Sequence, residues 1–511
     1  MVVIGAGPGG LAAAMLLAAQ GVRVVLHEKD EVPGGRTRTL VTEAGYRFDL
    51  GPTFFLYPRI LAEIFAACGA RLDEEVRLIR LDPLYRLVFE GSGMTLDATA
   101  DMARMEAELA KFCPEDARGL RPFLEENRRK LAAFKPALER SFDSVRDMMR
   151  PDILRSLALL RPHRSVDQDL SRHFRDPRVR LAFSFQTKYL GMSPFRCPSM
   201  FTILSFLEHE HGVFHPVGGC GAVSAAMARV AERLGVEIRY GSAVERIAFA
   251  GRCAIGVEAG GQHHAADAVV VNADFAHAIP RLIPEALRPS WRDRRIAQAR
   301  YSCSTFMLYL GIEGTLPGVA HHTVVLSGEY VRNIREIETG MIPEVPSFYL
   351  QHGTATDASL APPGHSTLYM LVPVPNLRCD ADWEREAPRY RRLALDRLRA
   401  AGVPEIEGRI RYERIVTPRQ WQQDFAVGYG ATFNLAHDFG QMLAFRPRNR
   451  FNDLRGVYLV GGGTHPGSGL PVIYESARIS VALLARDLGL SSRPAAAPIP
   501  EAPLAAPLGT G

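Results

Sequence analysis

Glycines at fixed spacing near the start of the chain carry the clearest chemical signal. Residues 5–10 read G-A-G-P-G-G, between an apolar run at Val2–Ile4 and an Ala- and Leu-rich stretch at Leu11–Gln20. A strand, a G-x-G-x-x-G turn and a helix in this order aim backbone N–H groups and the positive end of a helix dipole at a pyrophosphate. The pattern therefore predicts a dinucleotide site.

The glycines of this turn have separate roles. Gly5 allows the tight turn, and Gly7 lets backbone N–H groups approach the pyrophosphate. Gly10 lets the helix pack closely on the strands, and Gly9 is assigned to the same cofactor site. A glycine-rich strand–helix junction can also exist without a ligand, so the motif needs support from a second feature.

An acidic residue provides that support. Val22–His27 forms a second apolar run and is followed directly by Glu28. An acid at the end of the second strand accepts hydrogen bonds from the 2′- and 3′-hydroxyls of a ribose. Its charge also repels a 2′-phosphate, which disfavours NADP.

Two further segments extend the predicted site. Pro33–Arg36 follows the acid, and Phe48–Thr53 comes after it. Two glycines and an arginine beside a nucleotide suit a second close backbone approach and a cation near phosphate or flavin oxygens. This pair of segments resembles the flavoproteins of the amine oxidase, phytoene desaturase and GDP-dissociation-inhibitor group, which implies FAD as the cofactor. The cofactor residues assigned here are Gly35, Arg36, Gly51, Pro52 and Thr53.

A second glycine-rich turn predicts that the chain returns to the cofactor sheet. Residues 212–223 lead into a helix that continues to Leu234, and strands are expected at Gly235–Tyr240 and Ala268–Ala273. A short β excursion lies between these strands. In this register the backbone of Val244 passes close to the adenine.

A third glycine-rich turn joins a strand at Val457–Val460 to a helix that starts near Val472. Such a junction can place another helix N-terminus against the cofactor. In the flavoprotein group named above, this junction lies beside the ribityl chain and the flavin ring. It adds to the cofactor site Gly463, Thr464, Gly469, Leu470, Pro471 and Val472.

Length and composition exclude several classes of protein. The 511 residues are enough for two domains, and 47% hydrophobic with 23% charged residues is ordinary for a soluble protein. The net charge of +5 is too small and too dispersed to indicate nucleic-acid binding. The 7 cysteines include no C-x-x-C pair, which predicts reduced thiols in a cytoplasmic protein and no metal site. No apolar run is long enough to span a bilayer.

These motifs divide the chain into alternating regions. We expect a discontinuous FAD-binding domain at 1–95, 212–275 and 450–490, a helical substrate and membrane-contact segment at 96–211, and a substrate-domain sheet at 276–449. The expected helices of the second region are Ala100–Cys113, Ala117–Phe134, Val145–Leu160 and Asp167–Phe185. The expected strands of the third are Thr305–Gly311, Ser347–Gln351, Thr367–Val374 and Arg409–Thr417. Residues 491–511 are rich in Pro and Ala, which predicts a disordered tail.

Two apolar features suit a hydrophobic ligand. Leucines, isoleucine and methionines between Met148 and Leu160 alternate with arginines, and an apolar helix face edged by arginines suits the interface of an anionic membrane. The alternative is a core-facing helix with a solvated basic side. Phe425, Tyr429 and Phe433 could line a cavity, although aromatic residues beside a sheet are more often plain core.

Taken together, three segments resemble the bacterial-type phytoene desaturases, the carotenoid desaturase family, over roughly residues 1–490. They are V-V-I-G-A-G-P-G-G-L-A-A-A with P-G-G-R, G-V-F-H-P-V-G-G-C-G-A-V, and Y-L-V-G-G-G-T-H-P-G-S-G-L-P. His321–Val324 and Thr356–Pro362 add to the match. The T-H-P-G element stands where many relatives have an aspartate that binds the flavin. The resemblance implies an α/β fold, with a Rossmann-like FAD-binding domain and an inserted mixed β-sheet plus helical substrate domain.

The same resemblance implies an FAD-dependent enzyme that desaturates a long hydrophobic polyene, phytoene or its C30 analogue. An allylic carbon has no acidic proton, so hydride transfer to flavin comes first and the adjacent proton is lost afterwards. Asp147 and His465 are the candidate catalytic groups, although a solvated helix charge and a structural turn histidine are the plainer interpretations. Quinone or oxygen is the expected electron acceptor, and peripheral membrane association is expected. A terminal oxidase, ketolase or isomerase of the same family, and a non-catalytic prenyl-lipid carrier, remain as alternatives.

Overall fold

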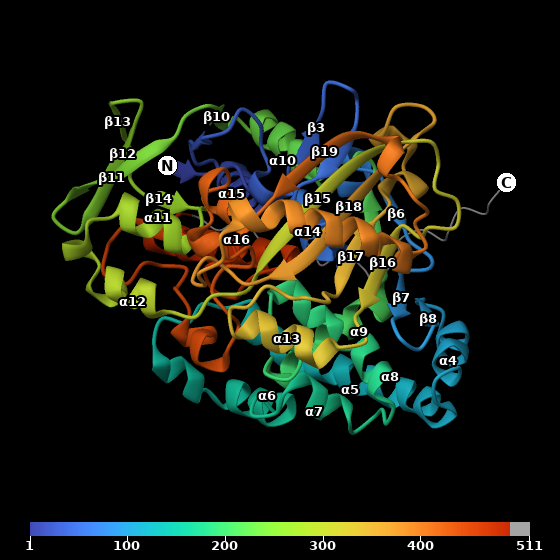
Figure 1. Ribbon diagram of the computed structural model, residues 1–511. Coiled ribbons are helices and arrows are strands. Elements are labelled where there is room, and N and C mark those ends of the chain that lie inside the picture. Colours follow the sequence, from blue (N-terminus) through green and yellow to red (C-terminus); the bar gives the residue numbers. More distant parts are fainter. Residues whose placement is uncertain (491–511) are drawn as a thin grey trace.

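The computed structural model describes residues 1–490, so the tail predicted at 491–511 lies outside the described residues. Its first layer is a parallel sheet of five strands in the order β10-β2-β1-β14-β20. The strands come from three distant parts of the chain, which confirms that the chain returns twice to this sheet. Their bounds are β1 Val2–Ile4, β2 Val25–His27, β10 Glu237–Arg239, β14 Val269–Val271 and β20 Val457–Leu459. Strands β10 and β14 of this sheet are labelled in Figure 1.

Helix α1 (Pro8–Ala19) is the centre of this domain. It is apolar on all sides because it is covered on all sides: it packs on the sheet, on α10 (Cys220–Arg233) and on α16 (Leu470–Asp487). The helix begins at Pro8 rather than at the expected Leu11, since a proline suits the first helical position, where its missing N–H is not needed.

A second sheet of seven strands has the order β19-β15-β18-β17-β16-β7-β8. Its bounds are β7 Tyr85–Phe89, β8 Met94–Ala98, β15 Ser304–Glu313, β16 His322–Leu326, β17 Phe348–Gln351, β18 His365–Val374 and β19 Ile410–Val416. The boundary expected at residue 95 is therefore wrong. It would cut the β7–β8 hairpin, which pairs with β16 in this sheet, with Arg86 opposite Thr323. Strand pairing over such a separation leaves no local sequence pattern.

Alternation along β15 gives this sheet two different faces. Phe306, Leu308 and Leu310 point to one side, where they pack with Trp383 and Tyr390 of α14 (Trp383–Arg397). Thr305 and Met307, at the alternate positions, point to the opposite face and line a cavity. The side chains of β15 thus contribute to the hydrophobic core on one face of the sheet and to the cavity wall on the other.

Helices form a third layer at the lower end of the molecule in Figure 1. The sequence predicts four long helices here, and prolines divide two of them. The expected helix at 145–160 breaks at Pro151 into a 3₁₀ turn η2 (Val145–Met149) and α6 (Pro151–Leu160). The expected helix at 167–185 is replaced by two short ones, and Pro177 starts the second. The bounds are α4 Met102–Ala110, α5 Pro114–Leu138, α7 Val166–Leu170, α8 Pro177–Ala182 and α9 Thr202–His211.

Smaller elements complete the fold. Three minor sheets consist of β3 Thr39–Val41 and β4 Arg47–Asp49; of β5 Phe55–Leu56, β9 Val213–Pro216 and β6 Leu78–Arg80; and of β11 Val244–Ala250, β12 Cys253–Ala259 and β13 Gln262–Ala265. The remaining α-helices are α2 Arg59–Ala67, α3 Leu72–Glu75, α11 Phe275–Leu282, α12 Asp293–Gln298, α13 Tyr330–Glu338 and α15 Pro418–Gln423. Within residues 1–490, no helix combines the length and the hydropathy that crossing a bilayer requires.

A buried ionic cluster joins the helices of the lower layer. Lys130 of α5 is fully buried; its Nζ lies 2.5 Å from Asp169 Oδ2 of α7 and 3.2 Å from Thr202 Oγ1 of α9. Arg161, which follows α6, contacts the same carboxylate at 2.9 Å and also bonds Glu126 of α5. The cluster therefore fixes four helices to one another through charges removed from water.

We expect Asp169→Asn to destabilise the fold by about 3–5 kcal/mol, because it leaves the buried Lys130 ammonium with less than its full compensation. The matched control is Asp73→Asn, which breaks an exposed pair with Arg71 and should cost less than about 1 kcal/mol. Urea unfolding followed by the helical circular dichroism signal measures both. Equal effects of the two substitutions would contradict the structural role of the cluster.

Candidate active site

One large cavity, of about 760 Å³, begins at the carboxyl ends of the parallel strands and extends along the open face of the seven-stranded sheet. Ile4 and Gly5 line it after β1, Glu28 after β2, Asn272 after β14 and Val460 after β20. The carboxyl edge of an open parallel sheet is where such folds bind their ligands. The cavity thus joins the predicted nucleotide site to the region expected to hold the substrate.

The first glycine turn is shaped by contacts that only glycine allows. Gly5 has a φ of +94°, and its N–H donates to His27 O at 2.7 Å. A Cβ on Gly10 would lie 2.0 Å from the Gly5 carbonyl oxygen, and one on Gly7 would lie 2.9 Å from Asn272 Nδ2. Gly5 and Gly7 line the cavity, whereas Gly9 and Gly10 are buried behind it. The last two therefore act through close packing.

Glu28 lies at the end of β2, as the sequence predicts. Its Oε2 accepts a hydrogen bond from Ala6 N at 2.6 Å and its Oε1 accepts one from Asp30 N at 3.0 Å. Burial raises the pKa of the Glu28 carboxyl. The two bonds fix the carboxylate at the cavity wall and leave it further acceptor capacity, which suits the hydroxyls of a ribose.

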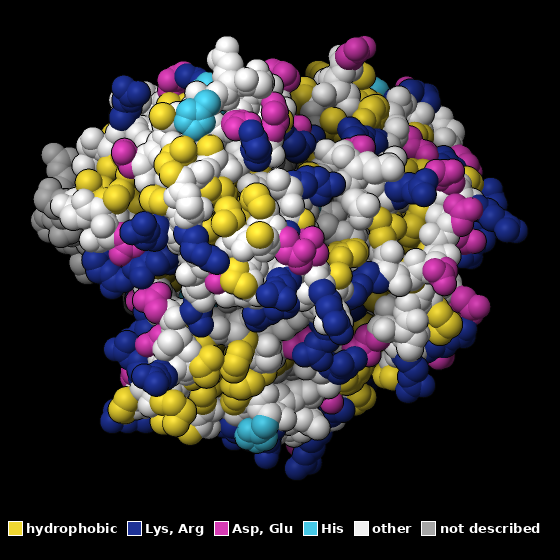
Figure 2. Space-filling model, turned by 90° about the vertical axis from the view of Figure 1, so that its left-hand side faces the viewer, with side chains coloured by type: hydrophobic (Ala, Val, Ile, Leu, Met, Phe, Trp, Pro, Cys, Tyr) yellow, Lys and Arg dark blue, Asp and Glu magenta, His cyan; other side chains and the backbone are white. Residues whose placement is uncertain are grey.

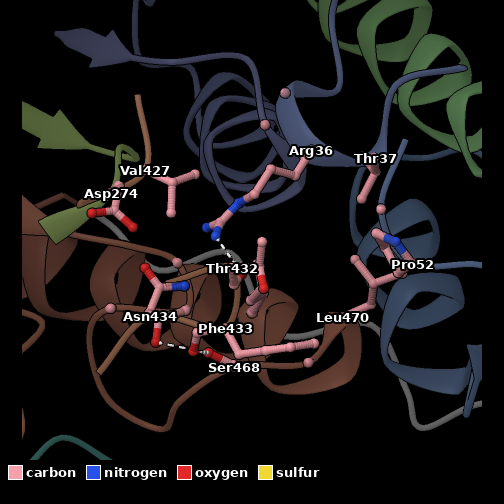
Figure 3. A pocket seen from close by; sticks show the side chains of 18 of the residues that line it. Arg36, Thr37, Pro52, Asp274, Val427, Thr432, Phe433, Asn434, Ser468 and Leu470 are labelled. Carbon is pink, nitrogen blue, oxygen red and sulfur yellow. Dashed lines mark hydrogen bonds between the residues drawn. The ribbon is translucent and has the colours of Figure 1, made fainter. Parts of the chain in front are cut away.

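Arg36 reaches across the cavity to a polar group that the sequence did not reveal (Figure 3). Its Nη1 donates to Thr432 O at 2.8 Å, and its Nη2 lies 3.2 Å from the amide oxygen of Asn434. These Asn434 contacts hold with the amide turned over from the orientation drawn in Figure 3, because only then does its nitrogen donate to Asp274 Oδ2, at 2.6 Å, while its oxygen accepts from Arg36. Burial lowers the pKa of Arg36 and raises that of Asp274. The network places a fixed cation against the space where a phosphate or flavin oxygen would bind.

The turn before α16 forms the opposite wall. Five of its six predicted residues line the cavity, namely Gly463, Gly469, Leu470, Pro471 and Val472. Thr464 does not, since its hydroxyl donates to Pro447 O behind the turn. Ser468 N donates to His437 Nε2 at 3.0 Å and Ser468 Oγ donates to Phe433 O at 2.7 Å, so the backbone here is held in place.

Arg446 supports this turn from behind and was missed by sequence reasoning. It is 1% exposed, and its guanidinium donates to Gly462 O at 2.6 Å, to Thr464 O at 3.1 Å and to Leu435 O at 3.3 Å. An arginine that binds backbone carbonyls leaves no sequence motif, because every residue type has a backbone carbonyl that can accept the hydrogen bond.

The two candidate catalytic residues are not at the cavity wall. His465 is buried behind the turn, and its Nε2 donates to Arg140 O at 3.0 Å. Burial lowers the pKa of His465 to about 4, so the ring is neutral. Pro466 and Gly467, the next residues, line the cavity instead. The structure gives His465 the task of tying the turn to the segment after α5.

Asp147 also needs correction. Its Oδ2 accepts hydrogen bonds from Ser144 N at 2.8 Å and from Asp143 N at 3.0 Å, which makes it part of the capping box of η2. It is not among the residues that line the cavity. The nearby arginines suggested a catalytic charge, but short-range capping accounts for the carboxylate.

The remaining predicted residues face the cavity. Gly35, Gly51, Pro52, Thr53 and Val244 all line it. Phe425 and Phe433 do so as well, whereas Tyr429 does not. Beyond them the walls are apolar and aromatic, and they come from both the sheet and the helical layer: Phe54, Phe134, Leu138, Tyr189, Phe201, Leu204, Leu207, Met307, Val324, Tyr349, Tyr369, Leu371 and Met442. Among residues 1–490, no three His, Cys, Asp or Glu side chains are grouped as metal ligands are.

Comparison with known proteins agrees with this geometry. The family profile described as "flavin containing amine oxidoreductase" matches residues 8–485. The chain belongs to this family. The cofactor is therefore flavin, bound as FAD. The residues present fit it: Gly5 and Gly7, where an added Cβ would collide with Asn272, the fixed Glu28 carboxylate and the Arg36 cation all face one cavity.

Members of this family with assigned names are similar over nearly the whole chain. The protein is 42% identical to a 4,4'-diapophytoene desaturase (4,4'-diapolycopene-forming) of Methylomonas sp., over 95% of both chains. It is 41% identical to an all-trans-zeta-carotene desaturase of Myxococcus xanthus, over 100% of this chain and 98% of the relative. A solved oxidoreductase from Methanosarcina mazei has the same fold, with a TM-score of 0.65, 18% identity and coverage of 95% and 99%. The resemblance seen in the sequence is confirmed.

We expect Gly10→Ala to weaken FAD binding by about 1–3 kcal/mol, or roughly 5- to 150-fold, because its Cβ would force α1 away from the Gly5 carbonyl. Glu28→Ala should lose flavin as well, since it removes the carboxylate that orients the ribose. Flavin retained through purification, measured by visible absorbance against protein, reports both. The control is Gly408→Ala, where a Cβ meets nothing within 4 Å. If Gly10→Ala and Glu28→Ala both kept the parent's flavin content, the assignment of the glycine turn and Glu28 to the FAD site would be wrong.

Proposed function

We propose that this flavoprotein desaturates a long hydrophobic polyene of the phytoene or C30 diapophytoene type in carotenoid biosynthesis. The observation that carries the proposal is a single cavity that joins a dinucleotide turn to an extended apolar and aromatic space. Relatives at 42% and 41% identity are carotenoid desaturases by name, and the second alignment, over 100% of this chain, includes the whole cavity. A polar substrate would find few partners along these walls.

The chain's own residues provide position and a dry environment. FAD held by these residues would supply the hydride-accepting chemistry that oxidation at an allylic carbon requires. The cavity wall beyond the nucleotide turn is made by aromatic side chains of the sheet, including Tyr349 and Tyr369, and by leucines of α9. These side chains would enclose the polyene substrate. Tyr369 OH donates to Gly51 O at 2.7 Å, which ties the sheet wall of the cavity to the Gly51 segment. Exclusion of water protects the electron-poor polyene left after hydride loss. We propose quinone or oxygen as the acceptor that reoxidises the flavin.

The first test is expression of the protein in cells that accumulate a colourless C30 or C40 polyene, followed by mass and absorbance spectra of the extracted lipids. We expect products lighter by pairs of hydrogen atoms and with absorption shifted to the red, because each step adds one double bond to the conjugated system. Oxygen-containing products would instead support a terminal oxidase or ketolase. Unchanged polyene from a protein that carries FAD would contradict the proposal.

We further propose that the protein takes up its substrate at a membrane surface through η2 and α6. Val145, Met149 and Leu154 are exposed by 52%, 68% and 44%, and Phe445 is exposed by 37%. Figure 2 shows hydrophobic side chains gathered low on one face with Lys and Arg around them. Arg146 and Arg155 are exposed on these elements, and neither forms an ion pair within residues 1–490. Such a surface suits anionic lipid.

The interior continues directly from this surface to the cavity. Met148 of η2 and Ile153 of α6 belong to one apolar cluster with Phe134, Phe201 and Met442, which line the cavity. The apolar interior is therefore continuous from η2 and α6 to the cavity wall. This continuity is what supports entry at α6 rather than elsewhere.

We expect the double variant Met149→Glu with Leu154→Glu to lose most binding to vesicles that contain anionic phospholipid, since two charges would have to enter the interface. Co-sedimentation measures it. Ile255→Glu is the control, because Ile255 is 43% exposed but lies on β12, away from α6. Replacing Arg146 and Arg155 by alanine should weaken binding by about 1 kcal/mol for each residue. Equal binding of the parent and the double variant would assign the membrane contact to another surface.

A further inference from the structure

A chain of polar side chains begins at the cavity wall. Thr53 and Tyr349 both line the cavity, and the Thr53 Oγ1 lies 2.6 Å from the Tyr349 hydroxyl. The same hydroxyl lies 2.7 Å from Nδ1 of His322, which is 1% exposed. The His322 ring stacks on Phe54, with 4.1 Å between ring centroids and 11° between planes. A hydroxyl on the substrate wall is thereby hydrogen-bonded to an imidazole that no solvent reaches.

The histidine is the first of three adjacent rings. The centroid of His321 lies 4.4 Å from that of His322, and the centroid of His215 lies 4.9 Å from that of His321. His215 Nε2 lies 3.1 Å from Asp357 Oδ2, and the same oxygen accepts a hydrogen bond from Gly218 N at 2.7 Å. Asp357 is buried, but its neighbour Ala358 is exposed. The rings thus lead from the cavity to a carboxylate near the surface.

Two ring nitrogens along this path are buried without a partner. Nε2 of His322 and Nδ1 of His215 make no hydrogen bond to any described residue. An unsatisfied buried polar atom costs free energy, so packing alone gives no reason to place histidines here. Both nitrogens of the intervening His321 are engaged: Nδ1 lies 2.7 Å from Thr356 Oγ1 and Nε2 lies 3.3 Å from Gln351 Nε2. A proton that passes between the adjacent rings would therefore have to exchange with the hydrogen bonds of His321.

The charge states suit proton transfer outward. Burial, together with the neighbouring histidines, lowers the pKa of His321 and of His322 well below the usual value, so both rings are neutral at rest. Burial opposes ionisation of Asp357, but hydrogen bonds from His215 and from backbone N–H groups outweigh it and lower the pKa of that carboxyl. The cavity end is therefore neutral and the outer end negative, which draws a positive charge outward.

We propose that Tyr349 and His322 accept the proton that the substrate loses, and that His321, His215 and Asp357 conduct it out of the cavity. The inference rests on the proposed desaturation. After hydride departure, the electron pair of the adjacent C–H bond becomes the new double bond. The proton binds the Tyr349 oxygen as the Tyr349 hydroxyl proton moves to His322 Nδ1. The sum of these shifts leaves Tyr349 unchanged and His322 protonated, and the proton then leaves towards Asp357.

The first experiment compares Tyr349→Phe and His322→Asn with the parent enzyme at equal flavin content. We expect either variant to desaturate about 10²- to 10⁴-fold more slowly, because each lacks a group that carries the proton. His322→Asn is decisive: its amide can hold the Tyr349 hydroxyl but cannot take a proton. Parent-like rates in His322→Asn would reduce the histidine to a positioning role and overturn the proposal.

Two controls match these changes. Tyr390→Phe removes another buried tyrosine hydroxyl, one that lies under the seven-stranded sheet and has no partner within residues 1–490. His263→Gln removes an exposed histidine of β13. Both should keep the parent rate. If the parent itself forms no desaturated product, the proposed function fails; if the parent is active and the relay variants match it, only the relay fails.

A second measurement needs no turnover. Histidine C2–H exchange with deuterium, read by mass spectrometry on the holoenzyme without substrate, reports the pKa and burial of each imidazole. We expect very slow exchange at His322 and an altered His322 titration in Tyr349→Phe, with His263 unchanged. Rapid exchange at His322, or a titration that does not respond to Tyr349→Phe, would refute the hydrogen-bonded pair even if the variants are poorly active.

Discussion

The architecture depends on how closely α1 approaches the edge of the parallel sheet. No side chain fits between Gly10 and the Gly5 carbonyl, and Asn272 occupies the space that a Cβ on Gly7 would need. Asn272 Nδ2 also donates to Gly5 O at 3.2 Å, so the residue that follows β14 fixes the turn that follows β1. Because α1 lies this close to the turn after β1, its N-terminus faces the cavity and the Glu28 carboxylate can accept a hydrogen bond from Ala6 N. Moving α1 outward would undo each of these contacts together.

The second constraint is the alternation of side chains in the seven-stranded sheet. The same strand, β15, supplies Phe306 to the core beneath α14 and Met307 to the cavity wall. A shift of one residue in its pairing would exchange the two faces. Pairing with β18 runs over the whole of β15, from Ser304 opposite Val374 to Glu313 opposite His365, which secures the register. Substrate recognition and stability are thus set by one hydrogen-bond ladder.

The sequence predicts those parts of the site whose residues lie close together along the chain. The strand–turn–helix and Glu28 are readable because their geometry is complete within the first part of the chain. Asp274 and Asn434 are not, because they acquire their role only when the fold brings them to Arg36. Asp147 misleads for the opposite reason: its charge pattern suggested chemistry, while its partners are its own neighbours. The domain limit at residue 95 fails because β7 pairs with a strand more distant than any periodicity can indicate.

The order of strands in the parallel sheet has a consequence for biosynthesis. β1 and β2 are translated long before their partners, since β14 spans residues 269–271 and the edge strand β20 spans residues 457–459. The wall formed by the start of α16 comes later still. Almost the whole described chain must therefore be translated before the flavin pocket has all its sides. Until then the aromatic lining is exposed to water, and the nascent protein is most vulnerable to aggregation in the interval before cofactor capture.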